Sequence, residues 1–484
     1  MNWLAAVRRF FDIRAMLPDG MEPLAPLPSG RETYGRYIEL AVPSVCEMVL
    51  ISLISMMDTV MVSGVGTDAV AAVGLVGQPR MIMLCIFFAL NVGITAVVAR
   101  RRGEERREAA NATVRTAVVL CVAFSALLVA LMVPLAEPLM RFAGAEEGRT
   151  LAESTEYFTI LAFAMPFQAL SMAMCAAQRG VGNTRLTMVV NITSNLVNIC
   201  FNWLLINGIG PFPRLGVRGA AIATAIGLAV GFVLSLAAML RSKGSSFLHL
   251  SLRDSWIPDR ESMQALYKVA SSAMVEQLAM RVGFFSYAKI VASLGTDAFA
   301  AHQICLQFMN LSFSCADGLG VAGTSLVGQM LGSKRRDLAH IYGTVAQRFS
   351  LVISLLLAAA CILLRAPLVS MFIRGGDSEN VREMAQHVMV VLGLIQPLQM
   401  LAVVSSGALR GAGDVRYTAR IMLLTVTVIR PVLAFTGVYI AGTLLHQQEI
   451  ALLCAWSATL CDMTVRTTLM LKRYRSGGWH SIRV

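Results

Sequence analysis

Charged residues are scarce in this chain of 484 residues: Asp, Glu, Lys and Arg make up 14% of it, whereas 56% is hydrophobic. Soluble globular proteins carry about 25% charged residues, and disordered chains are more polar still. The composition excludes both classes and is typical of a polytopic membrane protein. At roughly 20 apolar residues per span, the length accommodates about a dozen transmembrane helices.

Catalytic and metal-binding motifs are also missing. The sequence has no GxxxxGK[ST] loop, no HExxH, no GxSxG and no CxxC pair, and its ten cysteines are scattered singly through apolar stretches. Such cysteines behave as small hydrophobic residues. We therefore predict that the protein is not an enzyme, has no metal site and no cofactor, and does not use ATP directly.

The N-terminus lacks the apolar core of a signal peptide, because Arg8 and Arg9 interrupt a short hydrophobic segment. Its apolar residues share one broad face, which predicts an amphipathic helix lying on the inner leaflet.

Hydropathy predicts twelve spans, each long enough to cross the bilayer. They lie at 36–63, 69–99, 113–134, 153–177, 186–208, 218–240, 264–293, 298–331, 343–364, 384–408, 418–441 and 449–471. Most of the 41 Lys and Arg then fall on one side, which places both termini in the cytoplasm of a multi-pass protein of the inner or plasma membrane. The net charge of +12 is thus mainly topological, and we expect no nucleic-acid partner.

The chain repeats itself. GTDAVAAVG begins at Gly66 and recurs as GTDAFAAHQ at Gly295, and RGVGNTR begins at Arg179 and recurs as RGAGDVR at Arg410. The two intervals are nearly equal. Such a near-constant offset indicates two homologous halves of six spans each, which enter the membrane in the same direction. Parallel repeats of this kind place a substrate pathway at or beside their interface.

The predicted organisation has five parts. They are an amphipathic N-terminal segment (1–30), an N-lobe (31–240), a cytoplasmic inter-lobe linker (241–263), a C-lobe (264–471) and a basic cytoplasmic C-terminus (472–484).

Carboxylates inside the spans are functional candidates, because an intramembrane charge is costly unless it faces protein or water. Glu47 and Asp58 are eleven residues apart on the first span, about three helical turns, and therefore share a face. Asp58 is predicted to couple transport to an ion or proton, or else to cap a neighbouring helix. The repeat offset pairs Glu47 with Glu276, either as a coupling pair or as a symmetric structural pair at the lobe interface.

Amides form a stripe along the fifth span, where Asn191, Asn195, Asn198 and Asn202 follow at spacings of four, three and four. The stripe either joins helices in lipid or surrounds an ion site held by Asp58.

Further polar residues lie in other spans. Gln168 and Gln399 follow Pro166 and Pro397 and are candidates for lining a substrate cavity, and Asp317 is a possible site in the second half. Arg281 is predicted to neutralise Glu276 within one helix, and Asp462 to pair with Arg466 at i,i+4.

Six motifs in order carry a resemblance. They are MMDTVMVSGVGTDAVAAVG, QRGVGNTRLTMVVNITSNLVNICFNWLLI, LGVRGAAIAT, LGTDAFAAHQI, GTSLVGQMLGSKRRDLA and LRGAGDVR. Over essentially its whole length the chain resembles the multidrug and toxic compound extrusion (MATE) family of secondary antiporters, and YRSGGWHSIRV at the end looks like bacterial members.

The resemblance implies an all-α membrane protein of twelve helices in two pseudo-symmetric six-helix lobes around a V-shaped cavity. Cationic, amphipathic compounds would leave in exchange for protons or sodium ions. The family's coupling aspartate falls on Asp58, its asparagine and a nearby acidic position fall on Asn198 and Asn202, and its hydroxyl falls on Thr224. The amide at Asn202 removes a negative charge, and Gln399 stands where sodium-coupled members can carry aspartate.

Two other functions stay open. A flippase of lipid-linked saccharides or other amphipathic lipids would need a strongly cationic cavity, for which the spans supply mainly Arg80, Lys289 and Arg430. A receptor or intramembrane enzyme would need a soluble domain or a catalytic dyad. We expect small-molecule substrates, a lipid bilayer as the only other partner, and a monomer.

Overall fold

The computed structural model describes residues 10–18, 21–63, 67–209, 211–241, 246–251, 253–372, 379–444 and 447–482. Within these ranges every regular element is a helix, in agreement with the predicted all-α class. Twelve long helical segments occur there. They are α2 (Gly30–Ser63), α3 (Thr67–Gly103), α4 (Arg107–Met132), α6 (Arg149–Gly180), α7 (Thr184–Asn207), α8 (Gly216–Arg241), α9 (Arg260–Ala292), α10 (Thr296–Gly332), α11 (Arg336–Leu363), α13 (Glu379–Gly411), the composite segment from Val415 to Leu444, and α16 (Gln448–Arg475).

The composite segment departs from a plain α-helix. It runs through α14 (Val415–Met422), the π-helical η3 (Leu423–Ile429), α15 (Arg430–Val438) and a second π-helical stretch, η4 (Tyr439–Leu444). π-helical turns inside α-helices occur frequently at functional sites. Two short helices, α5 (Ala136–Phe142) and α12 (Arg365–Ser370), lie in connections.

Among the described residues, nine of the long segments are long and apolar enough to cross a membrane. The other three, α9, α10 and α16, have 33, 37 and 28 residues, which exceeds the roughly 20 that a span needs. The twelve predicted spans therefore match the twelve segments one to one.

The N-terminal segment is only partly described. Residues 1–9 of the predicted amphipathic helix lie outside the described residues. Residues 10 and 11 are helical, and the short 3-10 helix η1 (Arg14–Met16) follows them. Ile13 and Met16 are buried in the hydrophobic core.

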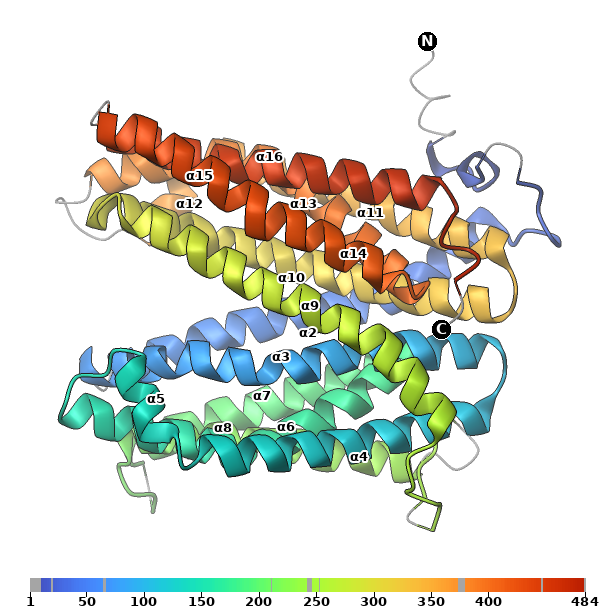
Figure 1. Cartoon of the computed structure of the whole chain (residues 1–484), viewed down its shortest axis with the longest axis horizontal. Helices are drawn as coiled ribbons and strands as arrows, with labels where there is room; N and C mark the ends of the chain where they lie inside the picture. Colours follow the sequence, from blue (N-terminus) through green and yellow to red (C-terminus); the bar gives the residue numbers. More distant parts are fainter. Residues whose placement is uncertain are drawn as a thin grey trace. The chain divides into compact units, whose positions relative to one another are not determined.

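The chain divides into two compact units. Unit 2 comprises Cys46–Met274, and unit 1 comprises Met1–Val45 together with Val275–Val484. The two division points lie within α2 and α9, and the interval from Cys46 to Val275 equals that from Gly66 to Gly295 in the sequence repeat. In Figure 1, α3, α4, α6, α7 and α8 belong to unit 2, and α10, α11, α13 and α16 belong to unit 1.

The repeat is visible in matched helix crossings. In unit 2 a Cβ on Gly180 would come within 2.9 Å of the Thr95 carbonyl oxygen, and the Thr95 hydroxyl donates to the Ala176 carbonyl at 3.1 Å. In unit 1 a Cβ on Gly411 would collide with the Thr324 carbonyl oxygen. The Thr324 hydroxyl donates to the carbonyl of Gly407 at 2.7 Å. Both crossings require glycine, because any side chain would separate the helices.

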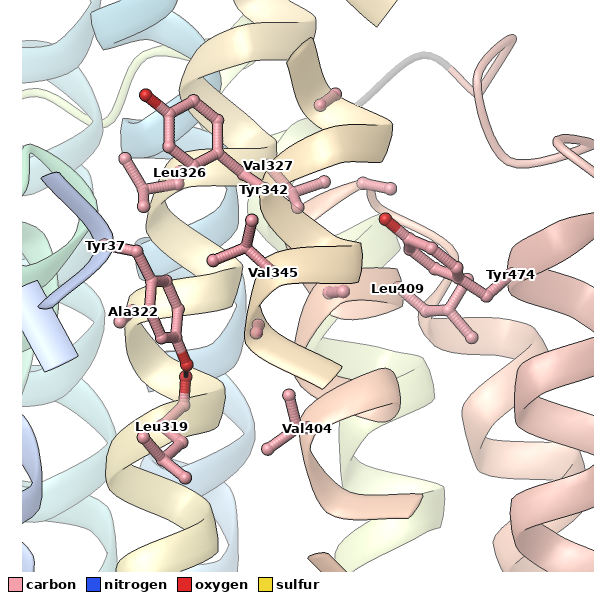
Figure 2. Close-up of a cluster of buried hydrophobic side chains, with 14 of the residues drawn as sticks. Tyr37, Leu319, Ala322, Leu326, Val327, Tyr342, Val345, Val404, Leu409 and Tyr474 are labelled. Atoms are coloured by element: carbon pink, nitrogen blue, oxygen red, sulfur yellow. Dashed lines mark hydrogen bonds between the residues drawn. The ribbon is translucent and has the colours of Figure 1, made fainter. Parts of the chain in front are cut away.

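A large cluster of buried apolar side chains lies at the end of unit 1 that contains Tyr474. Figure 2 shows Tyr342 and Val345 of α11 beside residues of α10 and α13, with the Tyr37 hydroxyl donating to the Leu319 carbonyl at 3.0 Å. The hydrogen bond satisfies the phenol in an otherwise apolar environment. The first turns of α2 are thereby held to the helices of the second half of the chain.

The predicted linker, 241–263, packs on unit 2 where it is described. The His249 N–H donates to the Asn111 side chain at 3.1 Å, Arg115 pairs with Asp254 at 3.1 Å, and Leu250 is buried. Residues 242–245 and 252 lie outside the described residues.

Candidate functional site

Two carboxylates of α2 are hydrogen-bonded to two asparagines of α7 at corresponding positions along the helices. Glu47 accepts a hydrogen bond from Asn191 at 2.7 Å, and Asp58 accepts one from Asn202 at 2.9 Å. The partners of both pairs are 144 residues apart in sequence. Because eleven residues span about three turns of an α-helix, the two carboxylates meet the two amides at two levels about 16 Å apart.

The Asp58 carboxylate is surrounded by amides. Asn202 donates from Nδ2 to Asp58 Oδ1, and Asn202 is almost fully buried. When the Asn198 amide turns its nitrogen toward Asp58, it donates to both carboxylate oxygens at 3.2 and 3.1 Å, and its oxygen accepts from the Thr224 N–H at 3.1 Å. That orientation satisfies every atom of the Asn198 amide, and we adopt it. The four residues predicted for ion coupling thus lie together in unit 2.

One atom of this site has no partner. Asn202 Oδ1 is buried and accepts no hydrogen bond from the described residues. A buried amide oxygen without a partner is costly. It lies on the same side chain that donates to Asp58, so rotation of the Asn202 amide would present this oxygen to a proton bound by Asp58.

A cation lies near the site. Arg80 of α3 donates from Nη2 to Gln168 Oε1 at 3.2 Å, and its charge interacts with that of Asp58. Among the described residues the two form no ion pair. Tyr157 of α6 interacts with Arg80 and Asp58 and bonds to the Thr224 hydroxyl. Gln168, predicted to line a cavity, therefore holds the guanidinium beside the Asp58 site.

Glu47 is fully buried and fully partnered. Its Oε1 lies 3.1 Å from Arg179 Nη1 and accepts from Asn191, while its Oε2 accepts from the Thr187 hydroxyl at 2.8 Å. Both oxygens of this buried carboxylate are therefore satisfied by partners of its own unit.

Glu276 has the matching environment in unit 1. It pairs with Arg410 of α13 and accepts from the Thr418 hydroxyl at 3.2 Å. The predicted neutralisation by Arg281 is wrong. Residues five apart on a helix point about 140° away from each other, so Arg281 lies on another face of α9.

The remaining candidates, Asp317 and Gln399, belong to unit 1, whereas Asp58 belongs to unit 2. Asp317 of α10 is exposed, and its charge interacts with Arg410 and Glu276. Gln399 is fully buried and donates to the Met309 carbonyl at 3.3 Å. The repeat offset pairs Gln399 with Gln168, yet Gln168 bonds to the Arg80 guanidinium whereas Gln399 bonds to a backbone carbonyl.

The predicted pair on α16 is confirmed. Arg466 Nη2 donates to both oxygens of Asp462, at 2.7 and 2.8 Å, and Arg430 Nε donates to Asp462 Oδ2 at 2.8 Å. All three side chains are buried.

The arginine and threonine partners of Glu47 and Glu276 are not among the residues predicted from the sequence, although the internal repeat contains a pattern that indicates them. Arg179 and Arg410 open the repeated motifs RGVGNTR and RGAGDVR, and Thr187 and Thr418 follow eight residues later in each. A duplicated arginine and a duplicated carboxylate are a pattern from which an ion pair in each half can be predicted.

Comparison with known proteins agrees with this arrangement. A family model described as MatE matches residues 43–204 and 272–436, one segment in each half of the chain. The chain belongs to the MatE family. It is therefore a multi-pass membrane transporter and not an enzyme, as predicted.

Individual relatives cover most of the chain. It is 28% identical over 447 residues to the probable multidrug resistance protein NorM of Thermotoga maritima, which covers 91% of this chain and 92% of that protein. It is 26% identical over 381 residues to the multidrug resistance protein NorM of Vibrio vulnificus strain YJ016, with 78% and 82% covered.

The fold is also found among solved structures. A structure described as the outward-facing conformation of a multidrug resistance MATE family transporter of the MOP superfamily aligns with a TM-score of 0.83. It has 21% sequence identity and covers 92% of this chain and 95% of that one. The likeness supports the MatE fold of twelve helices.

Proposed function

We propose that this MatE-family transporter is a secondary antiporter that exports cationic, amphipathic compounds in exchange for protons or sodium ions, with Asp58 binding the coupling ion. The observation that carries the proposal is the setting of Asp58. It is a carboxylate within a membrane helix, bonded to neutral amides and without an ion pair among the described residues. Binding a proton or cation offsets the cost of burying such a charge, so this carboxylate is suited to exchange one.

Of the two ions, we propose the proton. The amide nitrogens of Asn198 and Asn202 face Asp58, which suits an ionised carboxylate with no metal ion beside it. When Asp58 is protonated, rotation of the Asn202 amide presents an oxygen that accepts from the new hydroxyl. Sodium would require several oxygen ligands in place of these nitrogens, and Asp58 is the one carboxylate among the four residues proposed for coupling.

The names of the relatives support the substrate class, since those proteins are described as multidrug resistance proteins. We propose that the transporter works as a monomer in the plasma membrane, with both termini in the cytoplasm. The Lys and Arg of the loops favour that orientation.

The flippase alternative needs free cationic groups in a cavity. Two of the three basic residues available for it are engaged, since Arg80 bonds to Gln168 and Arg430 bonds to Asp462. Nothing in the described structure favours a lipid pyrophosphate over an organic cation.

The test uses purified protein in liposomes loaded with ethidium. We expect an imposed pH gradient to drive dye movement and a sodium gradient at constant pH to drive none. Liposomes containing the Asp58→Asn variant are the matched control. Sodium-driven movement would correct the ion, and absence of movement under both gradients would refute the antiporter.

A further inference from the structure

A charged cluster lies buried in unit 1, apart from the Glu276 pair. Arg430 and Arg466 share the carboxylate of Asp462, and the exposed fractions of the three residues are 1%, 2% and 0%. Arg430 Nη2 lies 2.5 Å from Asp462 Oδ2, and Arg466 Nε donates to the Thr425 hydroxyl at 3.2 Å. Two cations and one anion leave the cluster with a charge of +1.

Aromatic rings cover the Arg430 end of the cluster. The guanidinium carbon lies 5.2 Å from the centre of the Phe284 ring and 5.8 Å from that of Tyr287, both on α9. The faces of aromatic rings attract cations. The next carboxylate that acts on the cluster is Glu276, through Arg466. Glu276 is already paired with Arg410 and does not remove the excess charge.

The internal repeat relates this cluster, in unit 1, to the Asp58 site in unit 2 by sequence position. The sequence offset that relates Glu47 to Glu276 also relates Asp58 to Tyr287. The ring of Tyr287 packs against Arg430. The aspartate of unit 2 is thus replaced in unit 1 by an aromatic ring in contact with a guanidinium.

The amides are replaced as well. The sequence offset that relates Thr187 to Thr418 also relates Asn198 to Ile429, but the π-helical η3 begins after Thr418 and ends at Ile429. A π-helical turn closes its hydrogen bonds at i→i+5 and takes up one residue more than an α-helical turn. The residue that reaches the level of Asn198 is therefore Arg430.

We infer that Arg430 is a tethered cation that occupies, in unit 1, the place that the exchangeable coupling ion takes in unit 2. The inference rests on the proposed function. Its consequence is that one coupling ion is exchanged in each transport cycle, at Asp58. A guanidinium stays protonated at any physiological pH, and its covalent bond prevents release. The charge that Arg430 places at this position of unit 1 is therefore constant, whereas that of the Asp58 site changes.

The experiment measures how many protons exchange for one ethidium cation. Exchange of one proton for one monovalent cation moves no net charge. In proteoliposomes with the membrane potential clamped by valinomycin and potassium, we expect the equilibrium dye ratio to follow the pH gradient and to stay unchanged when about 60 mV is added. Exchange of two protons would change that ratio about tenfold, because 59 mV corresponds to a factor of ten for one charge.

Two variants test the role of the cluster. In Arg430→Gln/Arg466→Gln, Asp462 is left as a lone buried carboxylate, which must bind an exchangeable cation. We expect this variant to show the tenfold response to 60 mV. The matched control, Arg430→Gln/Asp462→Asn/Arg466→Gln, is neutral and should return to the wild-type response. Size-exclusion profiles establish that both are folded.

The wild-type measurement decides the inference even if a variant fails to fold. A tenfold response of the wild type to 60 mV would overturn it, and so would an unchanged response in a folded, active double variant. Absence of any gradient-driven transport by the wild type would instead refute the proposed function, and this inference with it.

Discussion

The two units carry the same carboxylate cluster but not the same coupling site. Glu47 and Glu276 each bind an arginine and a threonine at repeat-related positions. Three turns further along α2 and α9, unit 2 has Asp58 and unit 1 has Tyr287. The duplicated clusters indicate a structural role common to both units, whereas the site found in one unit alone is the candidate for coupling.

The largest effect should come from Asp58. Asp58→Asn keeps the size of the side chain and removes its charge, so we expect it to abolish ethidium efflux driven by a pH gradient in everted vesicles while leaving expression intact. Tyr287→Phe, at the related position of unit 1, should retain transport. Wild-type-like efflux by the Asp58 variant would contradict the comparison.

The next effect should be equal in both units. Glu47→Gln and Glu276→Gln each leave a largely buried arginine without its carboxylate, and breaking a buried ion pair costs about 3–5 kcal/mol. We expect both variants to lose thermal stability by about 10 °C in detergent, at about 2–4 °C per kcal/mol for units of this size.

Replacing both members of a pair should recover much of that loss, because apolar residues of similar volume can substitute for a buried pair. Glu276→Met/Arg410→Met is the variant to compare with Glu276→Gln. If Glu47→Gln and Glu276→Gln altered the pH dependence of transport without lowering stability, the clusters would be coupling sites instead.

A smaller effect is expected within the amide stripe. Asn202→Ala removes a hydrogen bond to a charged group, worth about 1.5–3 kcal/mol. We expect the pH of half-maximal transport to rise by one to two units, at about 1.4 kcal/mol per unit, because ionised Asp58 loses a donor. In Asn195→Ala, which removes an amide whose one bond among the described residues is to the Asn191 carbonyl of its own helix, the midpoint should not move.

The smallest effect should come from the N-cap residues of α2 and α9. The Ser29 hydroxyl accepts from the Glu32 N–H at 3.2 Å, and the Asp259 carboxylate accepts from the Ser262 N–H at 2.9 Å. Removing either N-cap should cost about 1 kcal/mol. The bonds from Ser262 hold the pKa of Asp259 below its usual range. Stability from this cap is therefore present above pH of about 4 and lost as the pH falls further.

Thermal melts across pH check this prediction. The difference between wild type and Asp259→Ala should vanish in acid, while that of Ser29→Ala should persist. A loss that is independent of pH in both variants would mean that the Asp259 charge has no part in the cap.

Much of the fold could be predicted from the sequence, because each span is a long apolar segment and the motifs repeat at a near-constant offset. The grouping of Asp58 with Asn198 and Asn202 was accessible for the same reason, since eleven-residue spacings on two helices bring carboxylates and amides to the same levels. The short helices α5 and α12 lie outside the predicted spans, and at seven and six residues they are too short for a hydropathy pattern of about 20 residues to reveal.

Long-range pairing was less predictable. Nearness in sequence predicts Arg281 as the partner of Glu276, whereas the observed partner, Arg410, comes from α13. The two π-helical stretches could not be predicted either, because hydropathy does not indicate a change in hydrogen-bond register. One of them shifts Arg430 by a residue relative to the repeat, and sequence offsets alone could not reveal that shift.

The division of the chain has a consequence for its biosynthesis. Unit 2 is one continuous stretch, whereas unit 1 combines the segment up to Val45 with the residues from Val275 onward. Because a chain emerges from the ribosome N-terminus first, unit 2 can assemble while the rest is still being translated. Residues 1–45 can complete their packing only after the helices from Val275 onward have been synthesised. A nascent chain interrupted after Met274 would contain all of unit 2 and only the first segment of unit 1.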